Sequence, residues 1–183
     1  MLKWLSKFIL FNIAGWRLQG RWPKEISKMI TIEVPHTSYW DFPIGILLRN
    51  ILDVQIQWAG KSSLFKFPFG SFFKWMGGVP VIRSRRTNFV NAIIDVYKTN
   101  DRMNICFAPE GTREKVDSLK TGFYYIATGA KVPIFMVKFD FENKIVWMRE
   151  LFYPTGDFDA DMAVIDDYFA GTKGKYPEKS YKL

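Results

Sequence analysis

The single histidine of the chain, His36, is separated by four residues from Asp41. Histidine is the usual general base near neutral pH, and a neighbouring carboxylate fixes its tautomer and stabilises the imidazolium that forms in the reaction. If a helix begins just after His36, Asp41 lies about one turn along and its carboxylate can reach the imidazole. The pair then predicts proton abstraction. The alternatives are a helix cap at Asp41, before Phe42-Pro43, and a loop histidine bonded to backbone.

The sequence contains no convincing protein nucleophile for such a base. It has no Gly-x-Ser-x-Gly elbow, and Cys106 falls within an expected strand, where a buried structural thiol is the usual finding. A lone cysteine excludes an intrachain disulfide, and one histidine with one cysteine makes a zinc site improbable. We therefore expect His36 to activate a hydroxyl group of the substrate itself.

Cationic residues follow the expected strands that come after His36. Lys61, Arg83 and the segment Pro109-Glu-Gly-Thr-Arg113 each stand directly after such a strand. Because the carboxyl ends of parallel strands meet at one edge of a sheet, these groups should lie near His36. Lys61, Arg83 and Arg113 then form a candidate phosphate site, with arginine giving bidentate contacts. A solvated basic edge is the alternative, and it is the preferred interpretation for Arg85 and Arg86.

The elements that must position these residues alternate between strand and helix patterns, which predicts one α/β domain with a mostly parallel mixed sheet flanked by helices. Glu142-Asn143 is expected to form a hairpin turn. Thr87 is expected to cap a helix and Gly129 to end one. The expected strands are residues 29–34, 54–59, 79–82, 104–108, 133–141 and 144–151, and the expected helices are residues 40–51, 62–76, 87–98 and 119–128.

Residues 1–28 read as an N-terminal segment that precedes the catalytic domain of residues 29–183. The segment is rich in Trp, Phe, Leu and Ile and carries six basic residues against Glu25 alone. It is too short to span a bilayer and lacks a signal-peptide cleavage site. An apolar helix with tryptophan and a cationic flank is typical of an interfacial membrane anchor. The alternative is a first helix packed on the domain's own core.

The net charge of +8 favours anionic partners, which include nucleic acid, an acidic membrane surface and a phosphorylated substrate. The sequence shows no aromatic platform interleaved with basic residues on a nucleic-acid-binding scaffold, so we expect no nucleic-acid partner. The aromatic share of 17% fits either an aromatic core or a surface that meets lipid.

Four ordered blocks between residues 29 and 139 resemble the glycerolipid acyltransferase family, which includes glycerol-3-phosphate and 1-acylglycerol-3-phosphate acyltransferases. Lys120-Thr-Gly-Phe also looks like this family. The blocks are His36 with Asp41, Gly77-Gly-Val-Pro-Val-Ile-Arg83, Phe107-Ala-Pro-Glu-Gly-Thr-Arg113 with Ala108 inserted after the Phe, and Val132-Pro-Ile134.

The resemblance implies that His36 takes the proton of an acceptor hydroxyl, that Asp41 orients His36, and that the acceptor oxygen attacks the thioester of acyl-CoA or acyl-carrier protein. No cofactor is implied beyond this co-substrate. Arg83, with Lys61 and Arg113, would bind the acceptor phosphate, while Glu110, Gly111 and Thr112 would shape the acceptor site. The aromatic stretch Phe65, Phe67, Phe69, Phe72 and Phe73 is a candidate wall of the acyl channel, with core packing as the alternative.

The implied acceptor is a glycerol phosphate or lysolipid, and the implied location is the cytoplasmic face of a membrane, peripheral or monotopic. The sequence departs from the family pattern at two points, and these departures keep a second acceptor class open. That alternative is a lipid without phosphate, such as an amino-acid-containing lysolipid. Pro35 stands where many members have Asn, and few residues precede the first block. The alternative outside the enzymes is that the chain is a non-catalytic protein that binds anionic lipid.

Overall fold

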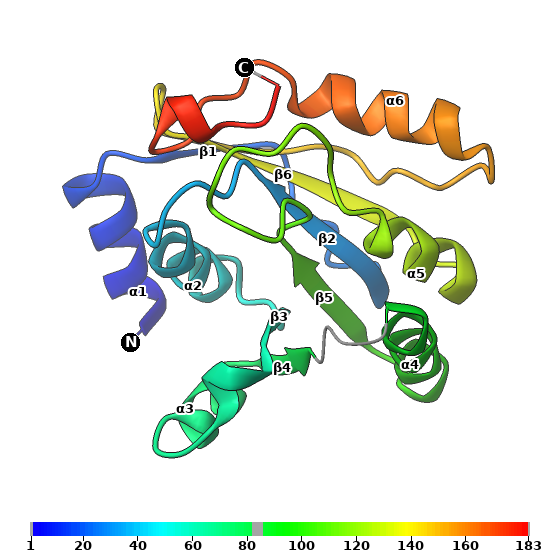
Figure 1. The fold of residues 1–183 in the computed structure, drawn as a ribbon. Coiled ribbons are helices and arrows are strands. Elements are labelled where there is room, and N and C mark those ends of the chain that lie inside the picture. Colours follow the sequence, from blue (N-terminus) through cyan, green and yellow to red (C-terminus); the bar gives the residue numbers. More distant parts are fainter. Residues whose placement is uncertain (1, 82–85, 183) are drawn as a thin grey trace.

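In the computed structural model, which describes residues 2–81 and 86–182, the chain forms a seven-stranded sheet in the order β1-β7-β6-β2-β5-β3-β4 (Figure 1). Every neighbouring pair is parallel except β6 and β7. The predicted mostly parallel mixed sheet is therefore confirmed. The strands are β1 Arg17–Gln19, β2 Lys28–Val34, β3 Gln57–Lys61, β4 Gly78–Val81, β5 Met103–Phe107, β6 Ile134–Asp140 and β7 Ile145–Met148.

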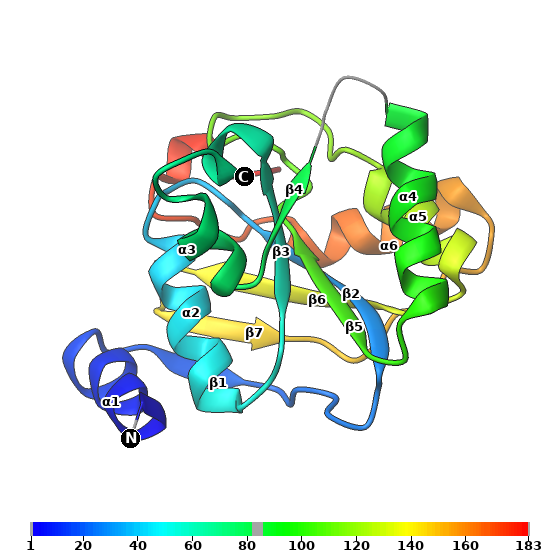
Figure 2. The same cartoon turned by 90° about the horizontal axis from the view of Figure 1, so that it is seen from below.

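Helices cover both faces of the sheet (Figures 1 and 2). Side chains of α4, α5 and α6 pack in one hydrophobic cluster, and those of η1 and α2 pack in another on the opposite face. The helical elements are α1 Leu2–Lys7, the wider-turned η1 Phe8–Ile13, α2 Asp41–Leu52, the 3₁₀ turn η2 Ser62–Phe65, α3 Gly70–Trp75, α4 Arg86–Thr99, α5 Gly122–Ala130, α6 Phe158–Phe169 and the 3₁₀ turn η3 Pro177–Lys179.

Strand alternation divides the core between the two faces. In β2, Ile30 and Ile32 belong to the cluster beneath α4, α5 and α6, while Met29 belongs to the α2 side. Because successive side chains of a strand point to opposite faces, Thr31 and Glu33 share the face of Met29. A carboxylate thus lies beneath α2 in a strand that is otherwise almost entirely apolar.

Two helix ends differ from the sequence expectation. The helix expected to end at Gly129 continues to Ala130, and Lys131 ends it in the left-handed conformation, with φ of 55°. Gly129 instead allows a close approach, since a Cβ there would collide with Ile94 of α4. Thr87 lies within α4 and not before it, because that helix begins at Arg86.

The expected helix over residues 62–76 is two short pieces, η2 and α3. Pro68 lies between them, where its ring and missing N–H prevent a continuous helix. The adjoining strand β3 begins at Gln57 and not at Val54. The sequence analysis also did not predict β1 or α6.

The N-terminal segment of residues 1–28 is divided in the structure. Residues 2–13 form α1 and η1, but Arg17–Gln19 is strand β1, and Trp16 and Trp22 are buried in the core. The part that stands outside the sheet is thus the helical residues 2–13. In the described part of the chain, no helix combines the length and apolar character needed to cross a bilayer.

Candidate active site

His36 lies in the loop between β2 and α2, and its Nδ1 is 3.0 Å from Oδ2 of Asp41. Asp41 is the first residue of α2 and is 1% exposed. Its Oδ2 also accepts a hydrogen bond from the backbone N–H of Ser38 at 3.0 Å. Trp40, not Asp41, is the N-cap residue of α2. The carboxylate therefore faces the loop and the imidazole, as the general-base hypothesis requires.

Glu110, which follows β5, fixes the same loop from the other side. Its Oε2 accepts a hydrogen bond from the backbone N–H of His36 at 2.6 Å, and the residue is only 2% exposed. Burial raises the pKa of Glu110 to about 8, although its hydrogen bond with the His36 backbone opposes that shift. The next residue, Gly111, has φ of 65°, and a Cβ there would collide with Lys120. The sequence analysis assigned Glu110 to the acceptor site; in the structure its carboxylate positions the histidine backbone.

Glu33 is a site residue that the sequence analysis missed. Its Oε1 lies 3.9 Å from Nδ1 of His36, and burial raises the pKa of its carboxyl. The signal was present in the sequence, because Glu33 is the lone acid in the apolar strand Met29–Val34 and stands three residues before His36. A buried acid in a strand that ends in a candidate base is a functional-site indicator.

The carboxylates control the protonation of His36. Burial by itself lowers the pKa of His36, but contacts with Asp41 and Glu33 outweigh that effect and raise it to about 10. The two carboxylates at Nδ1 therefore favour the protonated form of the imidazole. A general base must be neutral, so these carboxylates oppose the protonation state that the general-base hypothesis requires.

Glu33, His36 and Asp41 are also a group that could hold a metal ion, because one ligand atom from each lies within 4.8 Å of the others. The atoms that such a cation would use include Nδ1, which faces Asp41. A cation there would compete with the imidazole proton, because metal-bound histidine must be deprotonated at its ligating nitrogen.

Arg113 lies beside the histidine loop, where its Nε donates a hydrogen bond to the carbonyl oxygen of Ser38 at 3.2 Å. Its guanidinium carbon is 4.1 Å from the centre of the Tyr39 ring. Thr112 is exposed, and its Oγ1 accepts a hydrogen bond from the backbone N–H of Glu114 at 3.3 Å. Lys61 ends β3, whereas Arg83 falls outside the described residues. The structure thus brings Arg113 to the site.

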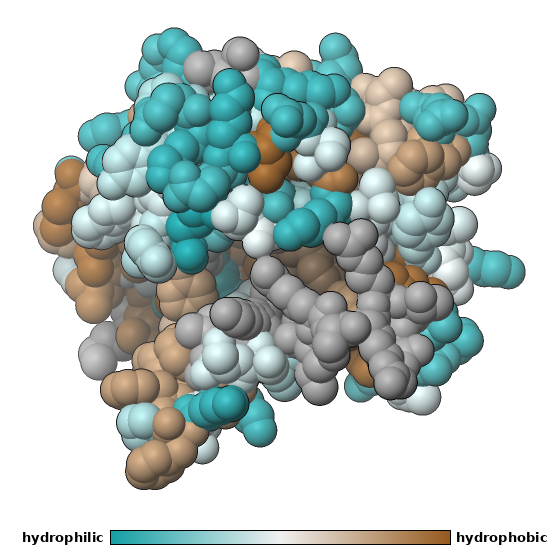
Figure 3. Space-filling model, in the orientation of Figure 1, coloured by the Kyte–Doolittle hydropathy of each residue, from teal (hydrophilic) through white to brown (hydrophobic). Residues whose placement is uncertain are grey.

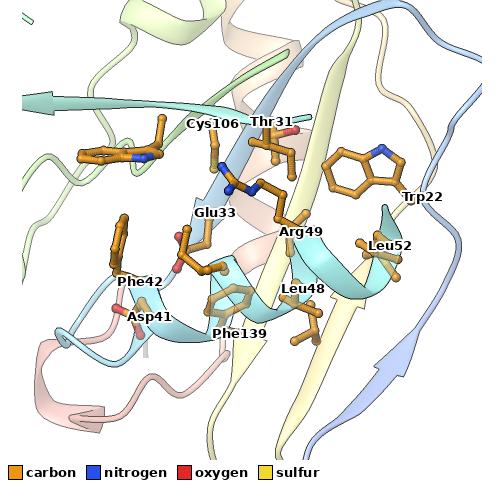
Figure 4. A pocket seen from close by; sticks show the side chains of 17 residues that line it. Trp22, Thr31, Glu33, Asp41, Phe42, Leu48, Arg49, Leu52, Cys106 and Phe139 are labelled. Carbon is orange, nitrogen blue, oxygen red and sulfur yellow. The ribbon is translucent and has the colours of Figure 1, made fainter. Parts of the chain in front are cut away.

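A mostly apolar cavity of about 120 Å³ runs between α2 and the sheet (Figure 4). Glu33 and Asp41 lie toward one end of it, and Trp22 and Leu52 toward the other. Asp41 and Leu52 are the two ends of α2, which at 1.5 Å per residue places them about 16 Å apart. The remaining lining residues are Thr31, Phe42, Gly45, Ile46, Leu48, Arg49, Ile56, Trp58, Cys106, Val137, Phe139, Val146 and Met148.

The phenylalanines named for the acyl channel do not line this cavity. Phe69 is 64% exposed and Phe72 is 51% exposed. Phe65 and Phe73 pack against Trp58, with ring centres 5.7 and 6.0 Å from it, and Trp58 is itself in the cavity wall. Phe65 and Phe73 therefore pack against a residue of the cavity wall without lining the cavity. Phe67, Phe69 and Phe72 are exposed.

The fold and the site together define an α/β protein with a histidine–carboxylate pair at the carboxyl edge of a mostly parallel sheet. The family model described as acyltransferase matches residues 25–139, which is more than half of the chain. The chain therefore belongs to the acyltransferase family and is an acyltransferase. The match includes His36, Asp41, Arg83 and the segment Pro109–Arg113.

Among solved structures, the chain is similar to the crystal structure of the 1-acyl-sn-glycerophosphate acyltransferase PlsC from Thermotoga maritima. The likeness has a TM-score of 0.58 at 21% identity and covers 91% of this chain and 76% of that chain. At this identity the comparison establishes a common fold. Comparison with curated proteins gave no significant match.

Replacing Glu33 with Gln should move the acid limb of the pH–activity profile to lower pH. Removing a negative charge beside an imidazolium destabilises it, so the pKa of His36 falls and the neutral base persists at lower pH. The measurement is kcat/KM against pH for wild type and Glu33→Gln. Asp159→Asn is the control, because that carboxylate is exposed in α6. An acid limb at the same pH in Glu33→Gln and wild type would show that Glu33 does not influence the base.

Proposed function

We propose that the chain transfers a fatty acyl group from acyl-CoA or acyl-carrier protein to a hydroxyl of a glycerolipid precursor, such as 1-acylglycerol-3-phosphate, in phospholipid biosynthesis. The observation that carries the proposal is the 3.0 Å contact between Nδ1 of His36 and Oδ2 of Asp41 at the end of an apolar cavity. Such a pair can activate a hydroxyl, and the cavity offers an apolar chain a place beside it.

The proposed reaction uses the two nitrogens of His36 differently. Asp41 lies at Nδ1 and holds a proton on that nitrogen, so Nε2 is the atom that takes the proton of the acceptor hydroxyl. The acceptor oxygen attacks the thioester carbonyl, which forms the new C–O bond and breaks the C–S bond. The imidazolium then returns its proton to the departing thiolate, which leaves as the free thiol.

Direct transfer is favoured over an acyl-enzyme. The thiol of Cys106 lines the cavity, but burial raises its pKa far above the ordinary value, so it is a poor nucleophile. The acceptor hydroxyl therefore attacks the donor itself, and His36 activates that hydroxyl directly.

The cavity beneath α2 is the proposed place of the donor's acyl chain. Its wall is mostly apolar, and one end lies at Asp41 and Glu33, next to the proposed reacting atoms. The acceptor phosphate is assigned to Arg83 and Arg113, with Lys61. Arg113 supports this assignment because its guanidinium is fixed at the histidine loop by Ser38 and Tyr39.

The membrane surface is the proposed location, on the cytoplasmic face. Residues 2–13 carry the exposed side chains Leu2, Trp4, Leu5, Phe8 and Ile13. Lys3 and Lys7 accompany them, and no acidic residue occurs before Glu25. A short helical segment of this composition lies in the interface of an anionic bilayer, where a lysolipid acceptor is found.

His36→Ala should lower kcat/KM for acyl transfer to 1-acylglycerol-3-phosphate by roughly 10²–10⁴-fold, the usual contribution of a general base. The assay is product analysis by lipid mass spectrometry with acyl-CoA and acyl-carrier protein as donors. Asp41→Asn should also lose activity, because it removes the charge that stabilises the imidazolium. Circular dichroism verifies that both variants are folded. Wild-type activity in His36→Ala would exclude the proposed mechanism.

Arg83→Ala should raise KM for a phosphate-bearing acceptor, since a bidentate cation for the phosphate is lost. Arg85→Ala is the matched control, because that neighbour is expected to be solvated. Both variants are assayed with 1-acylglycerol-3-phosphate and with an acceptor that has no phosphate. An unchanged KM in Arg83→Ala would favour the lipid acceptor without phosphate.

Gly45→Leu should shift donor preference toward shorter acyl chains. Gly45 of α2 lines the cavity, and a Cβ at that position meets nothing within 4 Å, so the new side chain occupies the proposed channel. Relative kcat/KM values for donors of graded chain length measure the shift, and Gly45→Ala, which adds a single carbon, should produce a smaller one. The same chain-length profile in all three proteins would place the acyl chain elsewhere.

A further inference from the structure

Large aromatic side chains project from the segment between β3 and β4. Four of them are exposed: Phe67 is 97%, Phe69 64%, Phe72 51% and Trp75 81% exposed. We call these four residues the α3 patch. A folded protein rarely exposes several neighbouring large apolar side chains, and such a surface usually marks a binding site.

Packing of the domain does not account for the α3 patch, because the same segment buries a different set of side chains. Phe65 and Phe73 face Trp58, and the ring of Trp58 also meets Phe42 of α2 at 5.2 Å. The inward aromatics therefore complete the wall of the cavity. The patch residues are those that the fold leaves outside.

The segment is held firmly against α2. Arg49 of α2 donates a hydrogen bond from Nη1 to the carbonyl oxygen of Met76 at 2.7 Å, and Nε1 of Trp58 donates to the same oxygen at 3.3 Å. Met76 is the C-cap residue of α3. The position of the α3 patch is thus fixed relative to the helix that covers the cavity.

The charged residues near the α3 patch in the sequence have one sign. Residues 54–94 contain six basic residues and no acidic residue. Two of the six, Lys66 and Lys74, are exposed within the segment itself. Aromatic residues interleaved with lysines and without acids are the composition that binds the interface of an anionic bilayer.

The α3 patch lies on the same side of the molecule as α1. Figures 1 and 2 both place α1 and α3 on the side where α2 lies, and α1 packs directly on α2. Figure 3 shows hydrophobic side chains over both projections, at the left edge and at the lower left. Both carry exposed tryptophan, with Trp4 70% and Trp75 81% exposed.

We propose that the α3 patch is a second membrane contact, which inserts Phe67, Phe69, Phe72 and Trp75 into the interface of an anionic bilayer while residues 2–13 form the first. Two contacts on either side of α2 fix the orientation of the domain, whereas a single helix would leave it free to rotate. In this orientation the cavity beneath α2 faces the membrane side. The inference rests on the proposed function for the bilayer as the source of substrate.

The test is partition of the full chain onto phosphatidylcholine–phosphatidylglycerol vesicles, measured by flotation without any substrate. Phe67→Ser with Trp75→Ser should lower the partition coefficient about tenfold, because two large apolar side chains are lost from the bound state. Tyr153→Ser with Val164→Ser is the matched control. Both of its residues are exposed, 61% and 39%, and lie after β7 and in α6, away from α3. The control should bind like the wild type.

Charge gives a second, milder test. Lys66→Gln with Lys74→Gln should weaken binding to the mixed vesicles and leave binding to pure phosphatidylcholine vesicles unchanged, because only the anionic lipid attracts the lysines. These exposed lysines have no role in the core, so the variant retains the fold.

Wild-type binding in the Phe67→Ser/Trp75→Ser variant, with loss of binding in Trp4→Ser/Phe8→Ser, would overturn the proposal by showing that residues 2–13 act alone. A change in oligomeric state by light scattering, with vesicle binding unaffected, would also overturn it by assigning the patch to a second copy of the chain. Because vesicle binding is measured without donor or acceptor, its result is separate from whether the chain acylates a glycerolipid.

Discussion

The carboxylate of Asp41 touches the imidazole of His36 and the backbone N–H of Ser38 at the same distance, 3.0 Å. Since Asp41 is also the first residue of α2, this one group joins the histidine loop to the helix that covers the cavity. The loop is held on its other side by Glu110, whose carboxylate accepts the N–H of His36. The orientation of the base and the position of the cavity roof are consequently set by the same residue.

The site gathers several buried acidic side chains around His36, and their charges must be compensated. Glu33 and Asp41 lie at Nδ1 of His36, Glu110 binds the backbone N–H of the same residue, and burial raises the pKa of the Glu33 and Glu110 carboxyls. Burial opposes the charged form of such carboxyls, and nearby cations or hydrogen bonds offset that effect. Arg113, held at the loop, is a cation that lowers the pKa of Glu33. The charge of Arg113 therefore stabilises the ionised form of Glu33 beside the imidazole.

The parallel strands and the pairing of His36 with Asp41 were predictable from the sequence, because both depend on local patterns. Apolar, β-branched segments mark β2, β5 and β6, and Asp41 follows His36 by five residues at the expected start of a helix. Glu33 was missed because its importance depends on which face of β2 lies under α2, which only the tertiary structure defines. The prediction for Gly129 was wrong for a similar reason. A glycine can end a helix or allow a close contact such as that with Ile94, and the sequence alone does not distinguish the two.

The acyl channel shows the same limit. The aromatic stretch from Phe65 to Phe73 was predicted to form a wall of the acyl channel, which stays a prediction, and the sequence could not separate the inward from the outward side chains, because Pro68 breaks the helical period. The cavity beneath α2 is lined largely by residues of α2, β6 and β7, among them Leu48, Phe139 and Met148. Contacts between such distant segments leave no local pattern.

Several residues of the cavity wall, including Leu48, Phe139 and Val146, also belong to the hydrophobic cluster between α2 and the sheet. A bound acyl chain would pack against the same side chains that hold the helix to the strands, as an additional member of the core. The same side chains would then make the dispersion contacts of both folding and binding. Each methylene that the cavity accepts would stabilise the native chain as well as the complex. A donor of the right length would act as a reversible core residue that the sequence does not encode.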